Sequence, residues 1–240
     1  PYSIRTDKAV YKASSYNFNR NVQLEGDNLY FIYTNCHVAQ YDLKQLLSPD
    51  GTVNPNYKPI IHQNPCEDFC VSPNGSKIAI ITKDGILSQT DNPSVKVDLK
   101  THKSLGSGKL GTRYGTIETL GGYYVVASYN DSTKSIGYSV FSAQLELLGF
   151  ATKPSANQMV QNMLLYQRQD TLHILAANEA NTVDVLLFND TTEKGKVKVH
   201  LIRSIAVSGA TYLLGLVWRV ESQEALLCGW PGLLKSLKLN

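Results

Sequence analysis

Short apolar runs, each bounded by Gly, Asn, Asp or Pro, make up most of this 240-residue chain. Such runs are typical of β-strands, because helices need a longer segment in which apolar residues recur every three or four positions. One stretch departs from this pattern. The segment "YDLKQLL" (41–47) predicts a turn or two of helix, which ends at the Ser-Pro-Asp-Gly sequence of residues 48–51.

The strand-like runs recur at a nearly constant spacing. Five runs begin at Leu29, Ile78, Tyr123, Leu172 and Ala225, which are 49, 45, 49 and 53 residues apart. Each run follows another strand-like segment and a short turn, and each is followed by a third strand. In four of the units a fourth strand follows. A period of this length predicts one supersecondary unit per repeat.

The second strand of each unit is apolar on consecutive residues, as in Ile78–Ile81. A strand with one face in water alternates between apolar and polar residues, so these strands must be covered on both faces. Four-stranded antiparallel sheets packed face to face around an axis provide that cover. We therefore predict an all-β fold, a β-propeller of four-stranded blades, as a single domain over residues 1–240. The predicted blades are approximately 17–64, 65–110, 111–156, 157–207 and 208–240.

Five units leave the closure of the ring open. The fifth unit reaches Asn240 without a fourth strand, and the segment Lys8–Ala13 could supply it and close a five-bladed ring. In the alternative, the five units belong to a larger propeller whose other blades lie outside these 240 residues. A ring with missing blades could also be completed by strands of a partner.

Two segments carry a resemblance to a known family. The sequences "DFCVSPNGSKIAIIT" (68–82) and "LLCGWPGLLKSLKL" (226–239) resemble WD repeats, in which a Ser-Pro-(Asp/Asn)-Gly turn joins the first two strands. The Gly-His and Trp-Asp dipeptides of well-formed WD repeats are absent, and Trp230 is followed by Pro231. The resemblance implies a WD-repeat-like propeller, a type that usually has seven blades.

Composition excludes several classes of function. Charged residues are 18% of the chain, the net charge is +3 and Lys and Arg form no run, so we expect no nucleic-acid partner. No uncharged stretch is long enough to span a membrane. The four cysteines, Cys36, Cys66, Cys70 and Cys228, suit reduced thiols of an intracellular protein, cytoplasmic or nuclear. The sequons at Asn74, Asn130 and Asn189 leave a secreted ligand- or sugar-binding propeller open.

Candidate chemistry is sparse. A G-x-G-x-x-G match at 106–111 precedes a strand-like segment instead of a helix, so we expect no phosphate-binding cofactor, and no metal-binding spacing occurs. Asp68 and Glu118 lie on predicted first strands, where a propeller hydrolase would place axial-channel carboxylates. The competing interpretation is that both bond neighbouring groups. His173 is expected to be a satisfied core histidine.

The remaining hypothesis is a binding surface. In an up-and-down blade, the loop between the second and third strands lies on the same face as the loop between blades, and function concentrates on such loops. We therefore expect a non-enzymatic protein–protein interaction scaffold, a subunit of a larger complex whose partners are other proteins. The predicted contact residues are His37, Lys83, Asp84, Arg113, Tyr114, Tyr129, Asn130, Asp131, Asn178, Glu179 and Trp230.

Overall fold

The structure is a computed structural model that describes most of the chain. The described residues are 22–33, 37–46, 58–62, 66–72, 75–82, 85–89, 96–98, 112–156, 159–190, 198–209, 211–219 and 222–238. Three predicted features lie outside them: the closing strand Lys8–Ala13, the loop residues Lys83 and Asp84, and the glycine motif at 106–111.

The described chain forms five antiparallel sheets, which we call blades 1 to 5. In each blade the strands are hydrogen-bonded in chain order. Blades 1 to 4 have four strands each, and three strands of blade 5 are described. The strands are, in blade 1, β1 (Val22–Glu25), β2 (Asn28–Tyr33), β3 (His37–Asp42) and β4 (Lys58–His62); in blade 2, β5 (Cys66–Val71), β6 (Ile78–Thr82), β7 (Ile86–Gln89) and β8 (Lys96–Asp98); in blade 3, β9 (Thr112–Leu120), β10 (Tyr123–Asn130), β11 (Ser135–Phe141) and β12 (Leu147–Pro154); in blade 4, β13 (Val160–Arg168), β14 (Thr171–Asn178), β15 (Thr182–Asn189) and β16 (Val199–Ala206); and in blade 5, β17 (Tyr212–Arg219), β18 (Glu224–Trp230) and β19 (Leu233–Lys238).

These sheets confirm the predicted all-β class and the four-stranded repeat. The predicted helix is present as the single turn α2 (Leu43–Leu46). Within the described part of the chain, no helix is long and apolar enough to cross a membrane.

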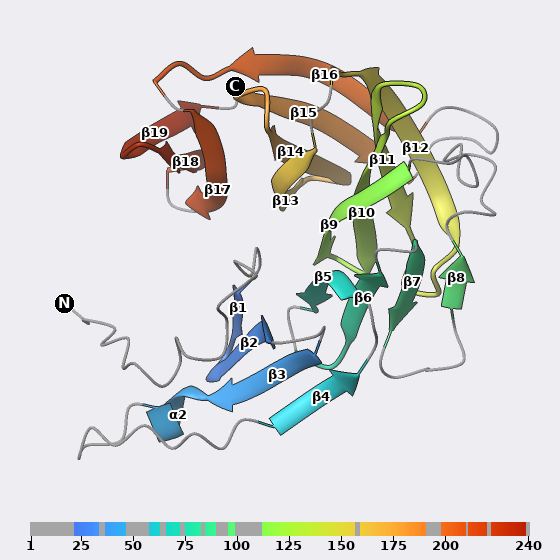
Figure 1. Cartoon of the computed structure of the whole chain (residues 1–240), viewed down its shortest axis with the longest axis vertical. Coiled ribbons are helices and arrows are strands. Elements are labelled where there is room, and N and C mark those ends of the chain that lie inside the picture. The colour runs from blue at the N-terminus through green and yellow to red at the C-terminus, as the bar shows by residue number, and fades with distance from the viewer. Residues whose placement is uncertain are drawn as a thin grey trace.

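The blades are arranged in an arc, with the first strand of each blade on the inside (Figure 1). The inner strands β5, β9, β13 and β17 pack against one another in that order. Blades 1 and 5 are the two ends of the arc and face each other across an opening (Figure 1). The chain therefore shows the blade packing of a propeller, with an open arc over the described residues.

The middle blades bury their second strands on both faces, as the consecutive apolar runs predict. All of β6 is buried, and so are seven of the eight residues of β10. Side chains of alternate residues contact different blades: Val125 and Ala127 pack toward blade 4, whereas Tyr124 and Val126 pack toward blade 2. Each large apolar side chain buried in this way stabilises the fold by about 1.5–3 kcal/mol.

Blade 5 departs from this prediction. Its second strand, β18, buries only one face: Ala225 and Leu227 pack against blade 4, while Cys228 and Trp230 are exposed. The run "ALLCGW" predicted cover on both faces, and that prediction is wrong for the described residues. The physical reason is that blade 5 is at the end of the arc, so no further described sheet covers its second face.

Polar side chains also join neighbouring blades. On three inner strands a side-chain oxygen accepts a hydrogen bond from a backbone N–H of the next inner strand. The three bonds are Val71 N to Gln23 Oε1 (2.6 Å), Ile117 N to Asp68 Oδ2 (3.0 Å) and Leu216 N to Asn162 Oδ1 (3.1 Å). Because inner strands of different blades share no ladder, these bonds satisfy backbone donors that the sheets leave unpaired.

Candidate functional site

Three of the predicted contact residues come together at the start of β9 and the end of β10. The guanidinium of Arg113 forms a two-point ion pair with Asp131, with Nε 3.1 Å from Oδ2 and Nη2 3.2 Å from Oδ1. It also lies over the ring of Tyr129, 5.2 Å from the ring centroid. Arg113 is exposed and Asp131 half-buried, whereas Tyr129 is fully buried and donates to the carbonyl of Ser155 (3.2 Å). Arg113 and Asp131 can therefore contact a partner, whereas the buried ring of Tyr129 packs beneath the Arg113 guanidinium and cannot.

Two predicted residues, Asn130 and Asn178, form turns instead of an exposed surface. Both are buried, and each uses its side-chain oxygen to accept bonds from the turn that follows it. Asn130 Oδ1 accepts from the backbone N–H groups of Ser132 and Thr133, at 3.0 and 2.9 Å. Asn178 Oδ1 accepts from the N–H of Ala180 in the same way, at 3.0 Å. The prediction that Asn130 and Asn178 contact a partner is therefore wrong, because the side chains of these asparagines stabilise the backbone turn that follows each of them.

Tyr114 is a second correction. It is 2% exposed and packs with Cys70, Ile81 and Leu87 in the core between blades 2 and 3. The sequence placed it on the loop between blades, but it is the third residue of β9 and faces inward. Its ring also lies against Gly85.

The other predicted residues have different positions. Glu179 is half-buried, and its carboxylate accepts hydrogen bonds from the N–H of Met159 (3.3 Å) and from the side chain of Gln161. These bonds connect the turn after β14 to the start of blade 4. His37 begins β3 and pairs with His62 in the ladder. Trp230 is 61% exposed at the end of β18, as a contact residue requires.

The two candidate catalytic carboxylates lie between inner strands. Asp68 is 2% exposed, and its Oδ2 accepts from the hydroxyl of Thr116 (2.8 Å) as well as from the N–H of Ile117. Glu118 lies within 3.5 Å of the side-chain nitrogen of Gln23. Burial, and then the charge of Asp68, raise the pKa of Glu118 to about 8. These contacts match the interpretation in which both groups bond their neighbours.

An exposed apolar surface on blade 5 was not predicted from the sequence, apart from Trp230. We call it the free face of blade 5; it consists of Val217, Leu226, Cys228, Trp230 and Leu234. Val217 pairs with Leu226 across β17 and β18, and Cys228 pairs with Leu234 across β18 and β19. Because side chains alternate along a strand, Leu226, Cys228 and Trp230 share this face. Val217 and Leu234 are 62% and 71% exposed.

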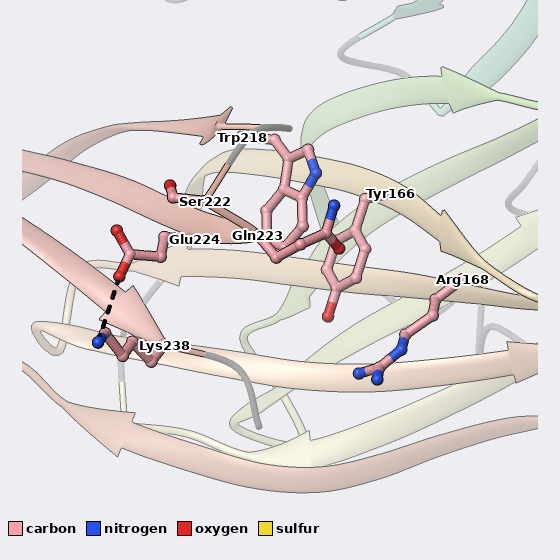
Figure 2. A pocket seen from close by; sticks show the side chains of 7 residues that line it. All are labelled: Tyr166, Arg168, Trp218, Ser222, Gln223, Glu224 and Lys238. Atoms are coloured by element: carbon pink, nitrogen blue, oxygen red, sulfur yellow. Dashed lines mark ion pairs between the residues drawn. The ribbon is translucent and has the colours of Figure 1, made fainter.

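A pocket of about 600 Å³ lies between blades 4 and 5, at the opposite end of the blades from the predicted loops (Figure 2). It is found where β13 and β17 end and their first turns begin. Its lining consists of Tyr166, Arg168, Trp218, Ser222, Gln223, Glu224 and Lys238. We call it the β13–β17 pocket.

An aromatic stack forms one wall of the β13–β17 pocket. Trp218 lies flat on Tyr166, with ring centroids 4.1 Å apart and planes at 5°. The ring of His173 stacks on Tyr166 as well, with centroids 4.5 Å apart, and its Nδ1 lies 2.9 Å from the Tyr166 hydroxyl. Burial and the charge of Arg168 lower the pKa of His173, so this half-buried histidine is neutral near pH 7. The predicted histidine thus has the expected hydrogen-bond partner, but it is half-buried instead of lying in the core, and it stacks on Tyr166 without lining the pocket.

Charged side chains lie on both sides of the stack. Lys238 Nζ is 3.8 Å from Glu224 Oε1, and Figure 2 shows this pair on one side of the aromatic rings and Arg168 on the other. Among the described residues Arg168 has no carboxylate partner within 4.0 Å. The pocket therefore combines an apolar wall with an available positive charge.

The sequence contained a signal for this pocket. Tyr166 and Trp218 lie near the ends of consecutive first strands, one position apart when Asn162 is aligned with Gly215, and Arg168 and Arg219 come shortly after them. Because adjacent positions of a strand face opposite sides, comparing the ends of the first strands, instead of loops on one face, would have placed the two aromatic residues on the facing sides of blades 4 and 5.

Solved structures resemble this arrangement of blades. The β-propeller domain of Cps50 (Swd1) from Myceliophteria thermophila matches with a TM-score of 0.56 and 12% identity, over 93% of this chain and 65% of that chain. The WD40 β-propeller domain of Doa1 matches with a TM-score of 0.59 and 12% identity, over 92% and 64%. The chain therefore has a β-propeller fold similar to that of these domains.

A third WD40-like structure was solved with a partner. Sqt1 of Chaetomium thermophilum, bound to the N-terminus of a ribosomal protein, matches with a TM-score of 0.60 and 13% identity, over 88% of this chain and 56% of that chain. This chain thus spans less than two thirds of the length of all three propellers. No family model and no curated protein sequence matches it.

Proposed function

We propose that this WD40-type propeller is a non-enzymatic protein-interaction scaffold and a subunit of a larger complex. The observation that carries the proposal is the free face of blade 5. Contiguous apolar side chains that are more than half exposed mark interaction sites on soluble proteins. Val217, Trp230 and Leu234 are exposed to this extent on one sheet face.

The chemistry of this face indicates what covers it. On its other side, blade 5 packs on blade 4 through Leu213, Leu216 and Leu227, and the free face carries the same kind of side chains on the same three strands. A face of this kind fits another β-sheet with apolar side chains, and we propose that a partner protein supplies it. In blade 5, Gly215 occupies the position from which Asp68 in blade 2 and Asn162 in blade 4 bond the next inner strand. Glycine has no side chain for such a bond, so apolar contact would hold the partner.

Two further expectations belong to this proposal. Arg113 and Asp131 offer a second contact region at the loops that the sequence singled out, and their mutual ion pair fixes the geometry of both. An intracellular location, cytoplasmic or nuclear, suits free thiols such as Cys70 and Cys228. Support for protein partners comes from similar propellers, since one was solved with a ribosomal protein and another in the mitotic checkpoint complex.

A hydrolase using Asp68 and Glu118 is the second candidate. The raised pKa of Glu118 favours it, because a protonated carboxylic acid at neutral pH is typical of general acids. The burial of Asp68 argues against it, because this side chain is 2% exposed and its Oδ2 bonds Thr116 and Ile117 of the neighbouring inner strand instead of facing an open channel. The structural role of both groups is therefore the better supported one.

The size of the native complex tests the proposal. In extracts of the source cells, the wild-type chain should sediment well above the mass of one chain, and Leu234→Glu should shift it to the monomer position. Ile202→Glu is the matched control, because Ile202 is 53% exposed on β16 and lies away from the free face. Monomeric wild-type protein, or a complex that survives Leu234→Glu, would refute the proposal. A purified dimer broken by Leu234→Glu would identify a second copy as the occupant and also refute it.

A further inference from the structure

We propose that the β13–β17 pocket binds an acidic side chain of an extended peptide segment from a partner protein. The inference rests on the proposed scaffold function and gives it a second site, separate from the free face of blade 5. The site is defined by the aromatic stack of Tyr166 and Trp218 and by the guanidinium of Arg168.

The aromatic wall gives the pocket an anchoring surface. Tyr166 is 7% exposed and is held between the rings of Trp218 and His173, so its position is fixed. Trp218 covers one face of Tyr166 and remains partly exposed toward the pocket. Partly exposed tryptophan and arginine are common anchors of protein interfaces, because tryptophan buries a large surface with two rotatable bonds and arginine adds a planar set of hydrogen-bond donors. A peptide can pack an apolar side chain or its own backbone on this wall.

The charges around the pocket favour an anion. Burial raises the pKa of Tyr166 and lowers that of His173, and in both groups the charge of Arg168 acts to lower the pKa, so the positive field of Arg168 reaches the aromatic stack. Arg203 acts on Tyr166 in the same direction. The carboxylate that lines the pocket, Glu224, already faces Lys238, and among the described residues no carboxylate lies within 4.0 Å of Arg168.

Further charged residues lie around the pocket. Arg219 lowers the pKa of Glu224, after the larger effects of Ser236 and Lys238, so a further cation lies near the pocket. Asp170 lies in the turn after Arg168 and is exposed, but it does not line the pocket. Among the described residues around the pocket, the cations Arg168, Lys238 and Arg219 outnumber the lining carboxylate Glu224. A planar guanidinium binds a carboxylate through two parallel hydrogen bonds.

The pocket rim suits a peptide. Gln223 lies on the turn between β17 and β18, and its side-chain amide carries both a donor and an acceptor. A peptide group presents the complementary N–H and C=O. Nucleic acid is disfavoured as the source of the anion, because the net charge of the chain is only +3 and its cations form no run.

Fluorescence anisotropy with paired peptides tests the inference. The probes are a panel of fluorescein-labelled peptides of about twelve residues in which Glu or Asp alternates with Leu or Phe, each with a twin that carries Gln or Asn instead. We expect purified wild-type chain to bind acidic peptides at least about tenfold more tightly than their twins, and Arg168→Gln to lose about tenfold in affinity. Lys134→Gln, which removes one positive charge from the exposed turn between β10 and β11 at the opposite end of the blades, should leave the affinity unchanged, and thermal unfolding should show that both variants fold.

Three results would overturn the inference: no binding across the acidic panel, equal binding of the amide twins, or full affinity in Arg168→Gln. The outcome is independent of the proposed complex. Leu234→Glu should leave peptide affinity unchanged, because Leu234 is on the free face of blade 5. Loss of the native complex in Leu234→Glu, together with absent peptide binding, would refute only the peptide site. Peptide binding together with an intact complex in Leu234→Glu would refute only the free-face proposal.

Discussion

Replacing Asp68 with alanine removes the polar connection between the inner strands of blades 2 and 3. The Asp68 side chain is 2% exposed and accepts from the Thr116 hydroxyl at 2.8 Å and from the Ile117 N–H at 3.0 Å. Alanine at this position leaves both donors without this acceptor in a dry interface. A hydrogen bond to a charged group contributes about 1.5–3 kcal/mol, and a buried donor left unpaired costs about 1–3 kcal/mol.

These magnitudes give a definite expectation for Asp68→Ala. The two bonds together correspond to about 4 kcal/mol. The charge of Asp68, after burial, raises the pKa of Glu118, which shows that the two carboxyl groups repel each other. Removing Asp68 relieves this repulsion and offsets part of the loss. We expect a net loss of about 3 kcal/mol in the free energy of unfolding. Asp68→Asn keeps an acceptor oxygen and should lose less than half of that amount.

Asn162→Ala provides a matched comparison. Asn162 occupies the equivalent place in blade 4, and its neutral oxygen accepts one bond, from the Leu216 N–H at 3.1 Å. The expected loss is about 1 kcal/mol. Urea unfolding followed by intrinsic fluorescence measures all three variants. An Asp68→Ala loss no larger than that of Asn162→Ala would refute the reasoning, since it would mean that charge and bond number do not matter at this interface.

Three further changes test other parts of the fold. The pKa of Glu118 is about 8 in the folded chain and has an ordinary value of 4.5, so between these pH values the folded chain holds a proton on Glu118 that the unfolded chain has lost. The free energy of unfolding should therefore fall as pH rises from about 5 to about 8. A Glu118→Gln variant with the same slope would contradict this. Gly85→Ala places a Cβ 2.4 Å from the ring of Tyr114, whereas the Cβ of Gly122→Ala meets nothing within 4 Å at a similar positive φ. In urea unfolding, Gly85→Ala should lower the free energy of unfolding by at least about 2 kcal/mol more than Gly122→Ala, and equal losses would exclude the clash. Asp184 is fully buried and accepts from four side chains, so Asp184→Ala should lose about 3–5 kcal/mol in the same assay, and a loss below about 1 kcal/mol would contradict the network.

The sequence predicted the blades well because their signal is local. The consecutive apolar residues of β6, β10 and β14 need cover on both faces, and a repeat near 49 residues supplies a neighbouring sheet for each. The same reasoning was wrong for β18, whose residues have the same pattern. Burial depends on whether a next sheet is present, and this information is not contained in the strand itself.

The candidate surfaces were harder to predict. Exposure of a loop residue depends on its rotamer and on its turn, so Asn130 and Asn178 could not be separated from contact residues by type alone. The β13–β17 pocket depends on Tyr166 and Trp218, which are 52 residues apart and become neighbours only through blade packing. The free face of blade 5 was missed because a residue-by-residue pattern does not identify the end of the arc.

Site-specific photo-crosslinking at position 234 tests the central claim most directly. A photoreactive phenylalanine analogue replaces Leu234 in the full chain expressed in its source cells, and the same analogue at Ile202 serves as the control. The scaffold account predicts crosslinks from position 234 to one other protein, through a strand segment with apolar residues, and none to that protein from position 202. Crosslinks confined to this chain, or equal crosslinks from both positions, would contradict the account.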